Sequence, residues 1–282
     1  MLTTRRGVRV LGAADLAPFT ALAARDAVAN VFADYRARTT NLDPRWLGGE
    51  VWGYFEEGEL TAACHVAANL VPVQCDAVAA QAFAERALAR GRTSSTIVGL
   101  SEPVGVMWDV LAGEWGPPRE CRWRQPHLVI SGDPVIEPDP EVRPCRREDL
   151  VSLYPACVAM YTEEVGVSPE AGGGADYYRA RIMQLIARGW SFARFDDDGR
   201  VLFKAEVACV TPHAAQVQGV FVPRELRGRG LATAGMAAVV AAVRRDIAPT
   251  VSLYVNEWNG PARAAYERVG FQQSGTFSTI MF

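Results

Sequence analysis

The stretch VPRELRGRGLATAGM, residues 222–236, joins an alternating strand pattern to a strongly apolar helix pattern through a loop of glycine and arginine. A helix N-terminus leaves its first backbone N–H groups unpaired and carries a partial positive charge. Glycines there let an anion approach the backbone, and arginine side chains add donors that match a phosphate. The stretch therefore predicts a pyrophosphate-binding loop, the alternative being a glycine-rich helix start with solvated arginines.

Two common phosphate loops do not fit this stretch. A Walker A loop needs Lys and Ser or Thr after its last glycine, whereas Gly230 is followed by Leu231 and Ala232. A dinucleotide fingerprint needs a third glycine, and Thr233 stands in its place. The pattern that does fit is R-x-x-G-x-A, formed by Arg227, Gly230 and Ala232.

A second motif follows in SLYVNEWNGPARAAYERVGF, residues 252–271. It predicts a strand that ends at Asn256, then a helix capped by Asn259, with Pro261 in its first turn and Gly270 at its end. Together, R-x-x-G-x-A and N-x-x-N-x-x-A-x-x-x-Y-x-x-x-G-F resemble the GNAT superfamily of acyl-CoA-dependent N-acyltransferases. The resemblance covers residues 142–282.

The sequence pattern of the second half of the chain predicts an α/β fold with mixed strand pairing. Helices are expected at 149–164, 175–189, 228–245 and 260–269, and strands at 142–145, 190–195, 200–209, 215–222, 250–255 and within 271–282. The resemblance implies a central mixed, mostly antiparallel sheet flanked by helices.

The chain also repeats itself weakly. Val8-Arg9 followed by Asp15-Leu16 recurs at an offset of 134 residues, and the hairpin pattern of 51–66 recurs in 191–207. A chance match of common hairpins is the alternative. We expect tandem GNAT-like domains: a degenerate domain in 1–133, a proline-rich acidic linker in 134–141 and an acetyltransferase domain in 142–282.

The first half lacks a phosphate loop at the corresponding place. Residues 70–91 have neither glycine nor arginine near the helix start, and Asp76 is expected to occupy the helix N-terminus. We therefore expect this half to bind no cofactor.

Composition narrows the class of protein. With 49% hydrophobic and 22% charged residues among 282, the chain is typical of a globular protein. No apolar run is long enough for a membrane helix, no signal peptide is evident, and six cysteines without C-x-x-C predict unpaired thiols. We expect a cytoplasmic protein without a membrane partner. Three scattered histidines predict no metal site, and a net charge of −3 disfavours nucleic acid as a partner.

The resemblance implies acetyl-CoA as cosubstrate and assigns cofactor-binding positions. Backbone N–H groups near Val220 and Val222 would contact the thioester and the pantetheine arm, and Tyr266 stands at the family position of the general acid. A tyrosine packed on the sheet is the alternative for Tyr266. The full cofactor-binding set comprises Val220, Phe221, Val222, Arg227, Gly228, Arg229, Gly230, Leu231, Ala232, Asn256, Asn259 and Tyr266.

The general base is harder to identify, because the strand AAQVQGVFV carries no glutamate. Glu206 is the first candidate, since it shares a strand face with Lys204 beside the expected cleft; a Lys204–Glu206 surface pair is the alternative. Proton loss to water is another. Glu163 and Glu164, at the end of a helix, and Glu206 are candidates for acceptor binding, with solvated helix-end acids as the alternative for Glu163 and Glu164.

Three function classes follow from these patterns. The first is an N-acetyltransferase that moves an acetyl group from acetyl-CoA to a small-molecule amine or a peptide α-amine by direct attack in a ternary complex. The second is an acyl-CoA-binding regulatory protein without turnover. The third, a nucleic-acid partner using Arg227, Arg229, Arg244 and Arg245, is disfavoured by the acidic net charge.

Overall fold

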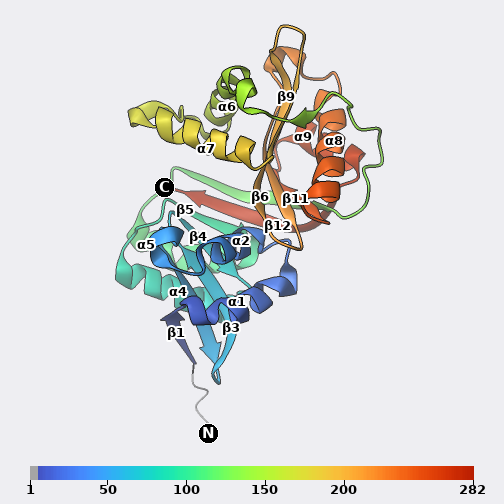
Figure 1. The fold of residues 1–282 in the computed structure, drawn as a ribbon. Helices are drawn as coiled ribbons and strands as arrows, with labels where there is room; N and C mark the ends of the chain where they lie inside the picture. The colour runs from blue at the N-terminus through green and yellow to red at the C-terminus, as the bar shows by residue number, and fades with distance from the viewer. Residues whose placement is uncertain (1–5) are drawn as a thin grey trace. The chain divides into compact units, whose positions relative to one another are not determined.

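The structure is a computed structural model that describes residues 6–282 (Figure 1). The chain forms two compact units. Unit 1 comprises residues up to Leu128 together with Tyr254–Trp258 and Gln273–Phe282, and unit 2 comprises Val129–Leu253 and Asn259–Gln272.

Unit 1 is an α/β unit built on one mixed sheet. Its strands lie in the order β1-β2-β3-β4-β5-β12-β6. The β4–β5 pair is parallel, whereas β1–β2, β2–β3, β3–β4 and β12–β5 are antiparallel. The elements are β1 (Arg6–Val10), α1 (Leu16–Ala23), α2 (Val31–Thr40), α3 (Pro44–Leu47), β2 (Glu50–Glu56), β3 (Glu59–Val66), β4 (Asn69–Val73), α4 (Ala77–Arg90), β5 (Thr96–Leu100), α5 (Ser101–Trp115), β6 (Glu120–Ile130) and β12 (Gln272–Met281).

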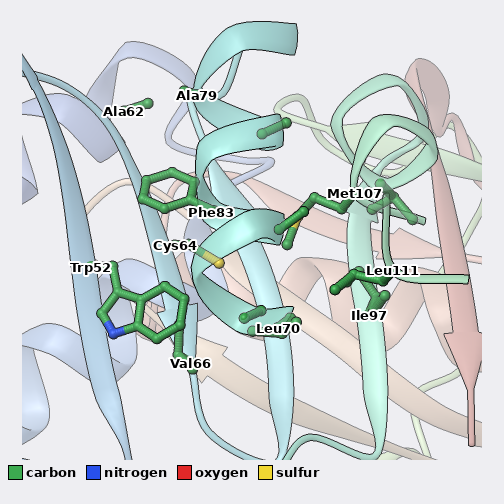
Figure 2. Packing of buried hydrophobic residues seen from close by; sticks show 14 of the residues in the cluster. Trp52, Ala62, Cys64, Val66, Leu70, Ala79, Phe83, Ile97, Met107 and Leu111 are labelled. Carbon is green, nitrogen blue, oxygen red and sulfur yellow. The ribbon is translucent and has the colours of Figure 1, made fainter. Parts of the chain in front are cut away.

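Alternate residues of this sheet enter two different cores, because side chains point to opposite faces along a strand. Trp52 and Cys64 pack with Phe83 of α4 and Met107 of α5 (Figure 2). Their neighbours Val51 and Ala63 instead pack with α1, α2 and α3, in a separate cluster with Phe19, Ala37 and Leu47. Helices therefore cover both faces of the sheet.

Unit 2 repeats this plan. Its strands lie in the order β11-β10-β9-β8-β7, with β10–β11 parallel and the other pairs antiparallel. The elements are β7 (Arg143–Pro144), α6 (Leu150–Val165), α7 (Ala175–Ala187), β8 (Ser191–Phe195), β9 (Val201–Val210), β10 (Ala215–Phe221), α8 (Leu231–Asp246), β11 (Val251–Tyr254) and α9 (Gly260–Val269). The predicted α/β fold and its helices and strands are confirmed to within a few residues.

Two details differ from the sequence-based expectation. Helix α8 begins at Leu231 rather than at 228, because Gly228 and Gly230 have φ of 77° and 81° and are not helical. The C-terminal residues form the single strand β12 rather than several strands.

Gly235 explains the close packing of α8, since a side chain there would lie 2.7 Å from the ring of Phe203 on β9.

The predicted duplication is visible in matching ion pairs. Arg9 donates two hydrogen bonds to Asp15, at 2.8 and 2.6 Å. Arg143 donates two to Asp149 in the same arrangement, at 2.7 and 2.9 Å. In each half the arginine lies in the first strand, and the aspartate is the N-cap of the helix that follows. This repetition of contacts argues against a chance match of sequence.

The matching hairpins are confirmed as well. They are β2–β3 and β8–β9, and their turns contain Gly58 and Gly199, which both have positive φ. Arg9 lies over the ring of Phe55 at 4.3 Å, and Arg143 lies over Phe195 at 5.2 Å. The two phenylalanines are the residues that the repeat aligns.

The compact units do not coincide with the predicted boundaries at 133 and 142. Strand β12 lies in unit 1, where it pairs with β5 from Phe277↔Leu100 to Met281↔Thr96. The predicted linker 134–141 lies in unit 2 and forms no helix or strand. Asp139 fixes it there, because its carboxylate accepts from Arg194 at 2.7 Å and its N–H donates to the carbonyl of Ala234 at 3.1 Å.

Other predictions concern single features. All six cysteines are unpaired, as expected, and four of them are buried. Over residues 6–282, no group of three or more His, Cys, Asp or Glu side chains could hold a metal ion. None of the helices in that range has the length and apolar character needed to cross a membrane.

Candidate active site

Strand β10 opens away from its parallel neighbour. The pairing of β10 with β11 covers Ala215 with Val251 and Gln216 with Ser252, whereas β10 itself continues to Phe221. On its other side β10 stays paired with β9, but the register shifts between Gln218 and Phe221. Backbone N–H groups of β10 that point away from β9 beyond Gln216 can therefore donate to a ligand.

The bulge in β10 is centred on a glycine. Gly219 has φ of 61°, in the left-handed region that other residues rarely adopt. A side chain there would lie 3.2 Å from the carboxyl group of Glu206 and from Nζ of Lys204. The ends of these two β9 side chains therefore lie directly under the bulge.

The predicted phosphate loop follows β10. Val222 and Pro223 lead into a single turn, Arg224–Leu226, after which Arg227 is extended and Gly228 and Gly230 have positive φ. Gly230 is the N-cap of α8 and has no side chain to occupy the first N–H groups, which belong to Leu231, Ala232 and Thr233. Nothing lies within 4 Å of the position that a side chain at Gly228 or Gly230 would take. The backbone of this helix end is therefore accessible to an anion.

The corresponding helix of unit 1 is closed. Asp76 is the N-cap of α4, and its carboxylate accepts a hydrogen bond from the N–H of Ala79 at 2.8 Å. This confirms the predicted capping by Asp76. A phosphate there would meet a negative charge in place of free N–H groups.

Glu163, a predicted acceptor-binding residue, lies against the phosphate loop. Arg227 donates to its carboxylate from Nη1 at 2.9 Å and Nη2 at 3.0 Å, and Arg224 donates from Nε at 3.2 Å. These hydrogen bonds hold the pKa of Glu163 below its usual value. The Nε of Arg227 also donates to the carbonyl of Val222 at 3.0 Å, which fixes the guanidinium beside β10. Arg229 donates to the carbonyl of Glu225 at 3.3 Å.

Glu206 is the centre of a buried charged network. Its carboxylate accepts from Lys204 at 3.3 Å, from Arg181 of α7 at 3.3 Å and from Gln218 at 2.7 Å. Burial opposes the charge of Glu206, but Lys204, Arg181 and the hydrogen bond from Gln218 outweigh it and hold its pKa below the usual value. The predicted Lys204–Glu206 pair therefore exists, but it is buried rather than at the surface: Lys204 is 0% exposed.

Tyr266 lies on α9, which packs against α8. Asn259 caps α9 by accepting from the N–H of Ala262 at 3.2 Å, as the sequence predicts. Tyr266 is buried, with its ring edge-on to Phe271 at 5.9 Å. Burial and the nearby charge of Glu164 raise the pKa of Tyr266, so its hydroxyl keeps its proton at neutral pH.

Asn256 belongs to unit 1, whereas the other predicted site residues belong to unit 2. Its side-chain oxygen accepts from Gln125 at 2.9 Å, and Gln125 in turn accepts from Thr279. All three side chains are buried. Asn256 thus ends a buried hydrogen-bond chain that runs through Gln125 of β6 to Thr279 of β12.

Sequence reasoning missed Arg181, Gln218 and Gly219. Arg181 is far from Glu206 in sequence, and a helix arginine carries no local signal of its partner. Gln218 and Gly219 did carry one, because a glycine inside a strand pattern indicates a bulge or a close approach.

The comparisons with known proteins agree with this geometry. Residues 187–271 match the family model described as Acetyltransferase (GNAT) family, and residues 49–153 match one described as Domain of unknown function (DUF4081). A mycothiol acetyltransferase from Brachybacterium faecium is 32% identical over 128 residues, which cover 43% of this chain and 38% of that protein. The matched part is therefore well under half of that relative's length.

Solved structures share the fold over nearly the whole chain. An acetyltransferase from the GNAT family of Colwellia psychrerythraea has a TM-score of 0.58 and 14% identity, covering 98% of this chain and 99% of the other. A tandem GNAT protein from the clavulanic acid biosynthesis pathway has a TM-score of 0.57 and 17% identity, covering 98% of each chain. At this identity the likeness concerns the fold. Residues 187–271 thus match the GNAT acetyltransferase family model, and the chain as a whole shares the fold of a tandem GNAT protein.

Proposed function

We propose that this protein transfers an acetyl group from acetyl-CoA to a primary amine, by direct attack in a ternary complex. The observation that carries the proposal is the open N-terminus of α8. It combines N–H groups that no N-cap side chain occupies, two glycines with positive φ and the guanidinium of Arg227. This arrangement is suited to a pyrophosphate. The relative named mycothiol acetyltransferase supports acetyl transfer in general.

The open edge of β10 supplies the next part of the proposal. N–H groups near Val220 and Val222 would bind the thioester carbonyl and the pantetheine arm, and Phe221 would line the same edge. A donor aimed at the carbonyl oxygen stabilises the negative charge that develops there when the amine attacks. Burial and Glu164 raise the pKa of Tyr266, which keeps it protonated but makes it a weaker acid; at the family position of the general acid, it would give its proton to the departing thiolate.

The attacking amine must first lose a proton. Glu206 lies beside the β10 bulge, but a carboxylate whose pKa is lowered by two cations is a weak base. We propose that the amine loses its proton to water. Glu206 would instead hold the charged side chains of Lys204 and Arg181 in place. Glu164 and Glu163, at the end of α6, would border the acceptor.

The second candidate function is an acyl-CoA-binding regulator without turnover. The observation that favours it is the same weak basicity of Glu206. Only the chemistry separates it from the first candidate, since both require acetyl-CoA to bind.

Two measurements on the full chain test the proposal. Calorimetry should give one acetyl-CoA site per chain, because α8 is open and α4 is capped by Asp76. Thiol release should then be followed with a panel of small amines, aminoglycosides and peptides. Release that depends on an amine supports the transferase, tight binding without release supports the regulator, and absence of binding rejects both.

A further inference from the structure

The network around Glu206 carries one more positive charge than negative. Lys204 and Arg181 are cations, and among residues 6–282 Glu206 is the one carboxylate that forms an ion pair with them. Two neighbouring groups stay neutral. Burial is the main cause that raises the pKa of the Cys157 thiol and that of the Tyr178 hydroxyl. The charge that remains is therefore positive.

The two cations differ in their access to solvent. The Lys204 side chain is 0% exposed, whereas that of Arg181 is 49% exposed. Because Lys204 forms a buried ion pair with Glu206, the carboxylate is already neutralised, and Arg181 is left as the cation that a solute can reach. Gln218, on the neighbouring strand, is exposed, so the network reaches the surface beside both side chains.

Arg181 is also held in place. Its Nη2 donates to Glu206 at 3.3 Å, while a guanidinium has five N–H donors in a rigid plane. The anchored group can offer its other N–H groups to an outside partner without paying the full entropic cost of ordering a free side chain. A planar anion with two oxygens suits this fork.

The network lies on the α7 side of the β10 bulge. Gln218 and Gly219 belong to the bulge. Gln218 donates to Glu206 from β10, a side chain at Gly219 would lie 3.2 Å from the Glu206 carboxyl group, and Arg181 donates to it from α7. The next step rests on the proposed function. If an amine attacks a thioester at the bulge, Arg181 would lie within reach of the substituents of that amine. We infer that the acceptor is an amine that also carries a carboxylate, as an amino acid does, and that Arg181 binds this carboxylate.

Matched substrates test the inference. Kinetics with a set of amino acids and the corresponding amino acid amides should give a kcat/KM at least about tenfold higher for the acids, as one charge-assisted hydrogen-bonded pair would produce. The ammonium groups of the amides lose their protons more easily than those of the acids, which by itself would favour turnover of the amides. A higher kcat/KM for the acids would therefore not come from the basicity of the amine. Arg181→Gln should remove the preference, mainly through KM. Arg179→Gln, two residues earlier on α7 and over the ring of Tyr154, is the matched control and should keep it.

A binding measurement separates this inference from the transferase proposal. Calorimetry with N-acetyl amino acids and their amides should show tighter binding of the acids to the wild type and equal binding to Arg181→Gln. Equal binding of the two by the wild type overturns the inference, whether or not acetyl-CoA is turned over. Turnover of acids and amides at equal rates overturns it as well and leaves the transferase proposal standing.

Discussion

Glu163 accepts two hydrogen bonds from the guanidinium of Arg227, at 2.9 and 3.0 Å, although one residue ends a helix and the other belongs to the phosphate loop. The carboxylate thus occupies donors that a pyrophosphate would use. Both side chains are partly exposed, at 33% and 43%. The pair is therefore of modest strength, and an incoming phosphate can displace it.

Replacing Glu163 should tighten cofactor binding. We expect Glu163→Gln to strengthen acetyl-CoA binding about two- to fivefold in calorimetry, since a partly exposed ion pair is worth up to about 1 kcal/mol. Glu164→Gln removes the same charge from the next residue and should give a smaller gain. Weaker binding by Glu163→Gln would mean that Glu163 organises Arg227 for the phosphate and does not compete with it.

A carboxylate at the start of α8 should abolish cofactor binding. In Gly230→Asp the new side chain would occupy the open N–H groups and repel a phosphate, as Asp76 is expected to do in unit 1. Gly230→Asn is the matched control, because it has the same shape and tolerates positive φ but lacks the charge. Calorimetry should show no binding for the first and measurable binding for the second, while both keep their far-UV circular dichroism. Equal affinity of the two variants would contradict a phosphate site at this helix end.

Tyr266→Phe tests the proposed acid. If the hydroxyl protonates the leaving thiolate, kcat should fall roughly 10²-fold while the acetyl-CoA affinity stays the same. A packed tyrosine without a chemical role would instead lose about 1 kcal/mol of stability and keep its turnover. Thermal unfolding and steady-state thiol release on one purified variant distinguish these results. Because a thiol with a pKa of about 8.5 can leave unassisted, full activity in the folded variant would remove Tyr266 from the mechanism.

The buried pair of Lys204 and Glu206 should respond strongly to single substitutions. Lys204→Met leaves a buried carboxylate without its fully buried cation and should cost about 3–5 kcal/mol of unfolding free energy. The double variant Lys204→Met/Glu206→Gln removes both charges and should cost less than the sum of the two single changes. Denaturant unfolding of the three variants and the wild type gives the coupling directly. Additive costs would show that the pair contributes little.

The lowered pKa of Glu206 also predicts that the stability of the protein depends on pH. Its pKa in the folded protein lies below the usual value, so the unfolded chain binds more protons as pH falls. The stability that Glu206 contributes is thus fully present above its unfolded pKa of about 4.3 and is lost as pH falls through the folded pKa. Denaturant unfolding between pH 3 and pH 7 should show a smaller loss for Glu206→Gln than for the wild type. Parallel curves would mean that the carboxylate titrates normally.

Much of the fold could be predicted because its signals are local. The hairpin glycines, the Asp76 cap and the start and end of α9 depend on hydrogen bonds between residues a few positions apart. The loop from Arg227 to Gly230 is of the same kind, since its shape follows from two glycines with positive φ. The tandem repeat was visible for the same reason, because each Arg–Asp pair spans six residues.

The sequence by itself therefore determined the order of elements, the duplication and the backbone shape of the loop from Arg227 to Gly230. Tertiary structure alone decided that β12 pairs with β5, that Asn256 bonds to Gln125, that Glu163 lies on Arg227 and that Arg181 reaches Glu206. These contacts join residues 25 to 185 positions apart. Their partners are set by how helices and strands pack, and an isolated arginine or glutamate in a sequence carries no mark of the charge that it will meet. Local hydrogen bonding fixes the elements, whereas long-range packing fixes the charges of the site.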